Sequence, residues 1–310
     1  MNKNLKIYLN KLNENWIVDR QRKEFVSHNH DIVTNFAYSS NLIWIIAPWT
    51  WSKISKYYLE RKKVVCTIHH IDENKLAVDI QNFNKRDYFV DTYHVTNEKT
   101  CSQLKNLTNK NILVEPFWIN PAYWKELKDK NSLRNKYGIS NEAFVIGSFQ
   151  RDSEGSNLNL PKLSKGPDRL KEIISYYNST KGNVLVLLTG KRRNYLIKEL
   201  KKLNISYLYF EMIDFSVLNE LYNLLDLYIV ASRFEGGPQS IYECAMTKTP
   251  IISTDVGVAN LILSEESIFN MENFKNAEPN IEIAFKNVQN YLPENSMLRF
   301  RKIMKDSIES

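Results

Sequence analysis

Short, continuous apolar runs recur along the 310-residue chain, and stretches with a helical period separate them. A short run that is apolar at every position is typical of a strand buried on both faces of a parallel sheet. Such runs predict strands at residues 42–47, 64–68, 89–96, 112–115, 144–149, 184–188, 207–210, 227–231 and 251–253. The patterns between them predict helices at 52–61, 168–177, 216–225, 281–291 and from 239 onward. This alternation favours an α/β fold with doubly wound parallel sheets, whereas roughly the first 40 residues show no clear pattern.

The uneven distribution of residue types predicts two units with different roles. All nine glycines lie at Gly138 or later, all six tryptophans at Trp124 or earlier, and all five histidines at His94 or earlier. We therefore expect an N-terminal domain, a C-terminal domain that opens with a linker, and a final segment, at residues 1–119, 120–285 and 286–310.

Charge, cysteine content and the lengths of the apolar runs exclude several classes of protein. The formal net charge of +7 comes from basic residues spread along the whole chain, which argues against a nucleic-acid-binding arm. Three widely spaced cysteines, Cys66, Cys101 and Cys244, form no disulfide framework. The N-terminus has no signal-peptide core, and the longest apolar run, 42–51, is too short to span a bilayer. We expect a cytoplasmic protein, and the basic charge leaves peripheral membrane contact open.

The stretch SRFEGGPQSIYECAMTKTPIISTDVG at 232–257 has the strongest functional pattern. A buried strand leads into a Glu-Gly-Gly-Pro loop and then into a helix N-terminus, which attracts phosphate. Glu235 and Glu243 lie eight residues apart, and eight residues of helix rise roughly 12 Å. The two carboxyls therefore cannot form the pair, ~5 Å apart, of a retaining glycosidase. They are better placed to hold two different parts of one long ligand.

This E-x7-E pattern resembles the signature of glycosyltransferase family 4, whose retaining enzymes have the GT-B fold. The resemblance implies that Glu235 meets the hydroxyls of the donor sugar, and that Glu243 holds the ribose of the nucleotide. It also implies that the loop backbone faces the diphosphate and sugar at Gly237, Pro238, Gln239 and Ser240. The alternative is a pair of solvated carboxylates at the start and middle of a helix.

A second element of the same family is an Arg…Lys-Gly pattern, which Arg151 and Lys165-Gly166 resemble. It implies that Arg151 and Lys165 bind the donor diphosphate, whose charge grows as the glycosidic bond breaks. The family usually has only a few residues between the two cations, whereas here 152–164 intervene. This insertion is either a mobile flap or a sign that Lys162 takes the place of Lys165.

Two further loops of the second domain are expected near the nucleotide by the same resemblance. Gly190 and Lys191 follow a predicted strand, with a solvated basic turn as the alternative. Met212 lies where the family places a loop that contacts the base, with simple core packing as the alternative.

In the first domain, His69-His70-Ile71-Asp72 follows a buried strand. The family carries a first-domain histidine near the donor sugar, so we assign His70 to catalysis and His69 and Asp72 to acceptor binding. Metal binding and a structural role are the alternatives for the histidine pair. Trp49 and Trp51 are predicted to stack on a sugar acceptor, with core packing as the alternative.

The resemblance implies a GT-B architecture of two Rossmann-like domains facing a cleft, with a reduced first domain and a last helix that crosses back to it. It implies retaining transfer from a nucleotide diphosphate sugar to a glycan or lipid-linked acceptor, without a metal or other cofactor. The sequence contains no Asp-x-Asp, no GxGxxG and no P-loop, so metal-dependent GT-A and dinucleotide-binding classes have no support. The alternatives are a non-catalytic GT-B-like subunit that binds a polysaccharide or protein and, from charge alone, nucleic-acid binding.

Overall fold

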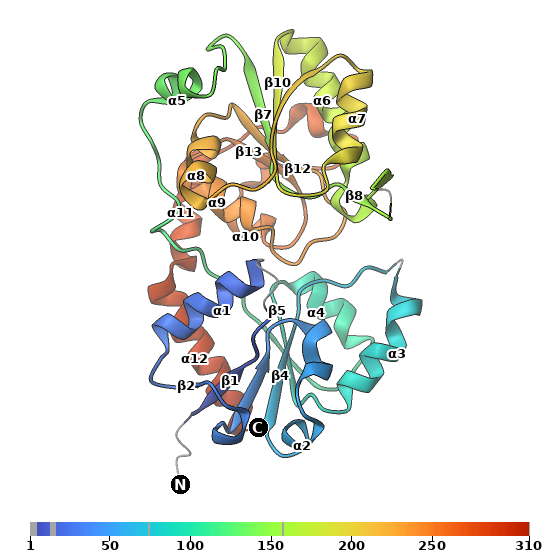
Figure 1. Cartoon of the computed structure of the whole chain (residues 1–310), viewed down its shortest axis with the longest axis vertical. Helices are drawn as coiled ribbons and strands as arrows, with labels where there is room; N and C mark the ends of the chain where they lie inside the picture. Colours follow the sequence, from blue (N-terminus) through green and yellow to red (C-terminus); the bar gives the residue numbers. More distant parts are fainter. Residues whose placement is uncertain (1–4, 13–16, 74, 157, 310) are drawn as a thin grey trace. The chain divides into compact units, whose positions relative to one another are not determined.

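The computed structural model describes residues 5–12, 17–73, 75–156 and 158–309. The chain divides into two compact units, Met1–Trp118 with Tyr291–Ser310, and Ile119–Asn290. Each unit is built on a parallel sheet with helices on its faces, which confirms the predicted α/β class (Figure 1).

The sheet of the first unit has six strands among the described residues, in the order β2-β1-β3-β4-β5-β6, and every neighbouring pair is parallel. The strands are β1 Ile7–Leu9, β2 Val33–Thr34, β3 Leu42–Ile45, β4 Lys63–Ile68, β5 Thr92–Val95 and β6 Asn111–Val114. β3, β4, β5 and β6 were predicted from their apolar runs. β1 and β2 lie in the segment without a clear pattern, because two or three residues are too few to show a period.

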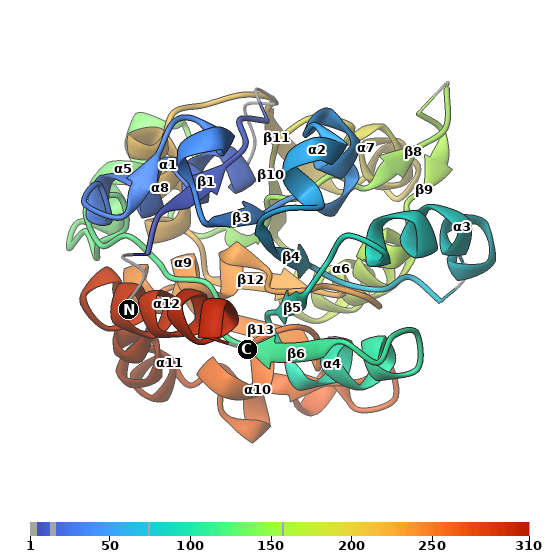
Figure 2. The ribbon, with the colours of Figure 1, turned by 90° about the horizontal axis from the view of Figure 1, so that it is seen from below.

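Helices cover both faces of this sheet (Figures 1 and 2). They are α1 Ile17–His28, η1 Ala37–Ser39, η2 Pro48–Lys53, α2 Lys56–Leu59, α3 Leu76–Asp87, α4 Glu98–Lys105 and α12 Pro293–Glu309, the η elements being 3-10 turns. α1 and α12 pack on the face that carries Leu42 and Trp44. α3 and α4 pack on the opposite face, which carries Ile43 and Ile45. The alternation of neighbouring β3 residues between two cores explains why the whole strand is apolar.

The last helix completes the core of the first unit. Met297, Phe300 and Met304 of α12 are buried there, and the ring of Phe300 stacks on Trp44 with a centroid distance of 5.5 Å. Arg299 of α12 also forms an ion pair with Glu115, at 2.6 Å. Helix α12 therefore shares one core with strands β1 and β3, although nearly the whole chain separates them in sequence.

Two predicted elements of the first unit were wrong in extent. The helix expected at 52–61 is interrupted, because Ile54 has an extended backbone (φ −96°, ψ 135°) that puts its side chain into the core. The strand expected from residue 89 begins at Thr92, because Phe89 and Val90 donate backbone hydrogen bonds to a turn at the end of α3.

The sheet of the second unit is also parallel, and its described strands follow the order β11-β10-β7-β12-β13-β14. Numbered from β7, this is the doubly wound order 3-2-1-4-5-6. The strands are β7 Phe144–Ser148, β10 Val184–Thr189, β11 Ser206–Phe210, β12 Leu227–Val230, β13 Ile251–Thr254 and β14 Ile268–Phe269. A separate antiparallel hairpin, β8 Ser153–Glu154 with β9 Leu160–Pro161, lies in the insertion.

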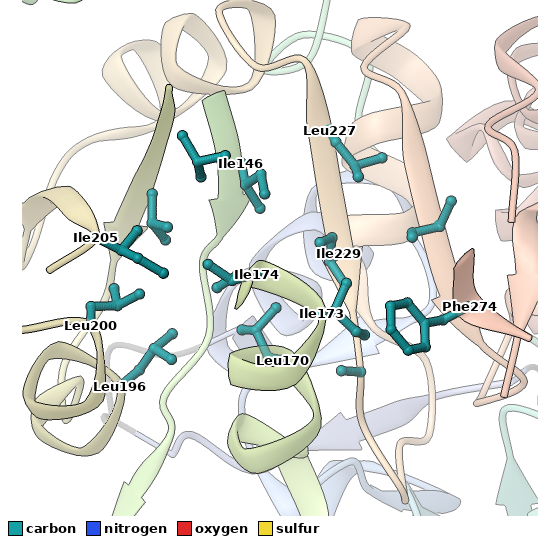
Figure 3. Close-up of a cluster of buried hydrophobic side chains, with 14 of the residues drawn as sticks. Ile146, Leu170, Ile173, Ile174, Leu196, Leu200, Ile205, Leu227, Ile229 and Phe274 are labelled. Atoms are coloured by element: carbon teal, nitrogen blue, oxygen red, sulfur yellow. The ribbon is translucent and has the colours of Figure 1, made fainter. Parts of the chain in front are cut away.

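Apolar side chains of α6 and α7 cover one face of this sheet and interdigitate with β7 and β12 (Figure 3). Leu170, Ile173 and Leu196 from these helices are fully buried against Ile146 and Ile229 of the strands. The helical elements of the unit are α5 Lys130–Lys136, η3 Leu163–Lys165, α6 Pro167–Lys181, α7 Asn194–Lys202, α8 Phe215–Asn223, α9 Gln239–Thr247, α10 Ala259–Ile262, η4 Glu265–Ser267, η5 Phe274–Asn276 and α11 Ile281–Val288. The turn η6 Gln289–Tyr291 begins in this unit and ends at the first residue of the returning segment.

The segment predicted as a linker is packed against the second unit. Trp124 is fully buried there and meets Tyr222 edge to face, with ring centroids 5.7 Å apart. Arg134 of α5 is 4% exposed, donates to the carbonyl of Leu224 and forms an ion pair with Asp226. Buried aromatic and ionic contacts therefore hold this segment in place.

Candidate active site

The second sheet reverses its strand order between β7 and β12, which lie side by side. In doubly wound sheets such a switch point opens a crevice at the carboxyl ends of the strands, where ligands bind. The loop after β7 carries Arg151, and the loop after β12 carries Glu235. The topology therefore brings these two predicted residues to one edge of the sheet.

Lys165 and Glu235 meet directly at this edge. The Lys165 ammonium and the Glu235 carboxylate form an ion pair, with side chains 19% and 10% exposed. The Ser232 hydroxyl also donates to Oε1 of Glu235, at 3.3 Å. Lys162 lies instead 3.8 Å from Glu154 in the hairpin. The geometry thus places Lys165, rather than Lys162, beside the first glutamate of the motif.

Arg151 lies within electrostatic range of the same carboxylate. Burial is the main cause that lowers the pKa of Arg151, and the Arg192 cation lowers it further, while Glu235 and Glu154 raise it. Of the two predicted phosphate-binding cations, Lys165 therefore pairs with Glu235, and Arg151 lies within electrostatic range of it. Such a cluster can bind an anion and hold a polar ligand at the same edge.

Several contacts hold the first residues of the insertion between Arg151 and Lys165 in place. The backbone amides of Asp152 and Ser153 both donate to the carbonyl of Arg192, at 3.0 Å. Asp152 also faces the buried guanidinium of Arg193, at 3.2 Å, and the Arg193 Nη2 donates to Ser148 at the end of β7. These contacts fix the residue that directly follows Arg151.

The second glutamate, Glu243, lies inside α9 and is only 6% exposed. The Tyr222 hydroxyl donates to its Oε2, at 2.7 Å. Burial, followed by the Glu243 charge, raises the pKa of Tyr222 well above its ordinary value, so this hydroxyl keeps its proton. Glu235 precedes α9, so the helical rise expected between the two glutamates applies only to the part from Gln239.

The loop between the glutamates leads into the first turn of α9, which begins at Gln239 as predicted. Gly257, the last residue of the motif, packs against this loop and has a positive φ of +58°. A Cβ on Gly257 would lie 2.7 Å from the Pro238 ring and 2.9 Å from the Gly236 carbonyl oxygen. Gly237, Gln239 and Ser240 remain partly exposed, whereas Pro238 is buried.

The two remaining predicted donor loops follow β10 and β11 at the same edge of the sheet. The carbonyl of Gly190 accepts a hydrogen bond from the Tyr209 hydroxyl, at 3.0 Å, and Lys191 is exposed. Met212 is 64% exposed, so the core-packing alternative for this residue is wrong. An exposed thioether beside the sheet edge is available for contact with a ligand.

The two adjacent histidines of the first unit have different surroundings. His69 packs between Trp49 and Phe117, with ring centroids 6.2 and 5.8 Å away, and its Nε2 lies 2.9 Å from the carbonyl of Ile46. Burial lowers the pKa of His69 to about 4, so the ring is neutral and donates from Nε2. His70 is exposed and Asp72 is partly buried. The sequence alone could not separate the two histidines, since their order says nothing about burial.

Trp49 and Trp51 also differ. Trp49 is 42% exposed next to His69, which leaves part of its ring open. Trp51 is 9% exposed, packs on Phe89 and donates from its indole nitrogen to Asn82, at 3.2 Å. The acceptor role predicted for Trp51 does not fit this placement, because a buried ring has no free face for a sugar.

One polar residue at the edge of the first sheet was missed from sequence. That sheet reverses its order between β1 and β3, and Asn10 directly follows β1. Asn10 is 4% exposed and donates from Nδ2 to the Thr50 hydroxyl, at 2.9 Å. Its Oδ1 has no hydrogen-bond partner in the described part of the chain. The only available signal, an apolar run of three residues before an asparagine, was too short to predict a strand.

Cys66, Cys101 and Cys244 are buried free thiols. Within the described ranges, no group of three or more His, Cys, Asp and Glu side chains is arranged to hold a metal ion. None of the helices in those ranges is both long and apolar enough to cross a membrane.

Comparison with known proteins supports the resemblance at the level of fold. Residues 159–278 match the family model described as Glycosyl transferases group 1, a range that contains every donor residue predicted in the second unit except Arg151. The fold is similar to that of Anabaena Alr3699/HepE in complex with UDP and glucose, with a TM-score of 0.74 and 13% identity over 97% of this chain and 100% of HepE. It is also similar to sucrose-phosphate synthase from Thermosynechococcus elongatus, with a TM-score of 0.68 and 15% identity over 96% of this chain and 80% of the synthase. No curated protein sequence matches the chain. The likeness to these two structures confirms the predicted GT-B fold class of two parallel-sheet α/β domains.

Proposed function

We propose that this protein is a glycosyltransferase that moves a sugar from a nucleotide diphosphate donor to a glycan or lipid-linked acceptor, with retention at the anomeric carbon. The observation that carries the proposal is the meeting of Lys165 and Glu235 at the switch point of the second sheet, with Arg151 in electrostatic range. The family match at 159–278 and the UDP and glucose bound to HepE support it.

In this proposal the second unit binds the donor. Arg151 and Lys165 bind the diphosphate together with the amides at the first turn of α9, because two cations and a helix N-terminus suit a doubly charged anion. Glu235 accepts hydrogen bonds from the sugar hydroxyls, and Glu243 accepts them from the ribose. The two side-chain cations supply the positive charge at the leaving group, so the reaction uses no metal.

The transfer itself proceeds on one face of the donor sugar. The acceptor oxygen forms a bond to the anomeric carbon while the bond from that carbon to the phosphate oxygen breaks. The electron pair of the broken bond goes to the diphosphate, and the proton of the acceptor hydroxyl passes to a phosphate oxygen. Since the new bond forms on the face that the diphosphate leaves, the anomeric configuration is retained. Arg151 and Lys165 stabilise the charge that develops on the leaving group.

The first unit supplies the acceptor contacts in this proposal. Trp49 offers a partly open ring, and the exposed His70 at the end of β4 contacts the transferred sugar. His69 holds Trp49 in position through ring packing. Nucleotide sugars and free thiols are both typical of the cytoplasm, which we propose as the site of the reaction.

A panel of nucleotide sugars, beginning with UDP-glucose, tests this function by thermal shift and turnover. A donor at about 100 times its dissociation constant should stabilise the protein by roughly 2.7 kcal/mol. The product should keep the anomeric configuration of the donor by NMR, and turnover should persist in EDTA. Binding without turnover on a broad acceptor panel would favour a non-catalytic subunit. Absence of any nucleotide-sugar binding would refute the proposal.

A further inference from the structure

The two loops that carry Lys165 and Glu235 are joined along their backbones. The carbonyl of Ser164 accepts hydrogen bonds from the amides of Arg233 and Phe234, at 2.8 and 3.2 Å. Gly166 allows this close approach with φ +62°, because an added Cβ would lie 1.9 Å from the carbonyl oxygen of Ala231. The turn before α6 therefore lies directly against the end of β12.

A side-chain ion pair also connects the same two loops. The Arg233 guanidinium donates from Nη1 to Oδ1 of Asp168, at 2.8 Å, and from Nη2 to Oδ2, at 2.6 Å. Nη1 also donates to the carbonyl of Leu163, at 2.9 Å. A bidentate pair of this kind restricts orientation as well as distance, because both planar groups must align. Neither Arg233 nor Asp168 was among the residues predicted to bind the donor or the acceptor.

The charge environment favours this pairing. Hydrogen bonding to Arg233 is the main cause that lowers the pKa of Asp168, and the same bond raises the pKa of Arg233. Asp168 also lies in the first turn of α6, where the helix dipole stabilises a carboxylate. The pair is therefore fully charged at neutral pH.

We infer that Arg233 and Asp168 form a clamp that positions Lys165 against Glu235 for the transfer reaction. The two anchored residues, Leu163 and Asp168, lie on either side of Lys165 in the chain. The clamp thus fixes the turn from which the Lys165 side chain extends, while the backbone bonds to Ser164 fix only one point of it. Arg233 and Asp168 act through these loops and touch neither the diphosphate nor the sugar. This inference rests on the proposed function.

The expected signature is a large effect on turnover with a small effect on stability. The two side chains are 26% and 33% exposed, and partly exposed ion pairs contribute little to folding. A catalytic group displaced by about 1 Å, in contrast, can reduce the rate about 100-fold. We expect Arg233→Ala and Asp168→Asn each to lower kcat about 10- to 100-fold, while affinity for the free nucleotide changes about threefold or less.

Two further variants test whether the pair acts as a unit. The double variant Arg233→Ala with Asp168→Asn should lose no more turnover than either single variant, because residues in one interaction are not additive. Arg233→Lys should recover only part of kcat, since a lysine cannot form the bidentate contact. Additive losses in the double variant would contradict the clamp.

The chain offers a matched control in the first unit. Arg301 and Asp31 form another bidentate pair with side chains 35% and 51% exposed, and neither was predicted to bind donor or acceptor. Arg301→Ala should change Tm by a similar amount to Arg233→Ala but leave kcat unchanged. If the two variants affect kcat and Tm alike, Arg233 has a structural role only and the inference is overturned.

A crystal structure of Arg233→Ala gives a readout that does not depend on activity. The clamp predicts that Lys165 and Glu235 separate in this variant. An intact Lys165–Glu235 ion pair would overturn the inference even if the wild-type protein transferred no sugar. Failure of the wild-type protein to bind any nucleotide sugar would instead refute the proposed function, so the two failures are distinguishable.

Discussion

Lys165 and Glu235 form an ion pair although 70 residues separate them in the chain. The proposed function gives them different partners on the donor, a phosphate oxygen for the lysine and sugar hydroxyls for the glutamate. A lysine ammonium has three donors, so Lys165 can contact Glu235 and a phosphate oxygen at the same time. The pair would then link the sugar-binding and phosphate-binding parts of the site.

Replacement of Glu235 separates sugar contact from nucleotide contact. We expect Glu235→Ala to spare the affinity for free UDP but to lower turnover at least about 10-fold, because hydrogen bonds to a charged group contribute about 1.5–3 kcal/mol. Isothermal titration and steady-state kinetics measure the two effects. Equal losses of nucleotide affinity and turnover would show that Glu235 supports the loop rather than the sugar.

Substitution of Arg151 and Lys165 tests the proposed diphosphate site. Lys162 serves as the control, because it faces Glu154 instead of Glu235. Arg151→Ala and Lys165→Ala should each lower turnover on the order of 10²–10³-fold, as for other preorganised donors to developing charge. Donor affinity should fall less, since the charge is largest in the transition state. Lys162→Ala should turn over like the wild-type protein. Loss of turnover in Lys162→Ala together with wild-type turnover in Lys165→Ala would assign the diphosphate contact to Lys162 instead.

The buried carboxylate of Glu243 is predicted to hold the ribose. Glu243→Gln should weaken nucleotide binding about 10-fold or more, because it removes a charge-assisted hydrogen bond. Tyr222→Phe is the matched control, since it removes the hydroxyl that donates to Glu243 but leaves the carboxylate in place. It should affect nucleotide affinity less than Glu243→Gln. Unchanged UDP affinity in a folded Glu243→Gln variant contradicts the assignment.

Trp49 and Trp51 should respond to substitution in different ways. Trp49→Ala should raise the Michaelis constant for the acceptor with little effect on stability, because its ring is 42% exposed. Trp51→Ala should instead destabilise the first unit by about 3–5 kcal/mol, the usual cost for a buried aromatic residue. Urea denaturation and acceptor titration distinguish the two. An unchanged acceptor constant in Trp49→Ala excludes this ring from the acceptor site.

Acid should destabilise the first unit through His94. This ring is fully buried, its Nε2 lies 2.8 Å from the Glu115 carbonyl, and Nδ1 lies 3.0 Å from the Thr67 hydroxyl, which also accepts from Trp44. Burial lowers the pKa of His94 to about 4, so between pH 6.5 and pH 4 the unfolded chain binds the proton more readily. The stability is therefore fully present above pH 6.5 and declines as the pH falls toward 4, by a total on the order of 3 kcal/mol.

The measurement for this prediction is the denaturation midpoint from pH 8 to pH 4, followed by tryptophan fluorescence. His94→Gln should be less stable at pH 8 but should show a flatter decline with acid. His30→Gln, at an exposed position, serves as the control. A decline of the same size in His94→Gln would assign the acid sensitivity to other groups.

Local patterns were sufficient for most of the strands and for the start of α9. β3, β10 and β12 are apolar and buried along nearly their whole length, which is a pattern that the strand itself carries. Helix α9 begins at Gln239 as predicted, because the glycine loop and Pro238 are signals within a few residues of that point. The resemblance to GT-B enzymes likewise rested on short motifs, and the fold is shared with HepE.

The tertiary structure alone decided which of several similar residues reach the site. Trp49 and Trp51 are the same residue type two positions apart, yet one is 42% and the other 9% exposed. Lys165, rather than Lys162, meets Glu235. Hydrogen bonds between residues 65 to 70 positions apart, such as Arg233 to Asp168, hold the turn that carries Lys165 in this position. Strand order placed the ends of β7 and β12 side by side and so created the switch point. A sequence period describes only neighbouring residues, whereas burial and strand order depend on contacts between distant parts of the chain.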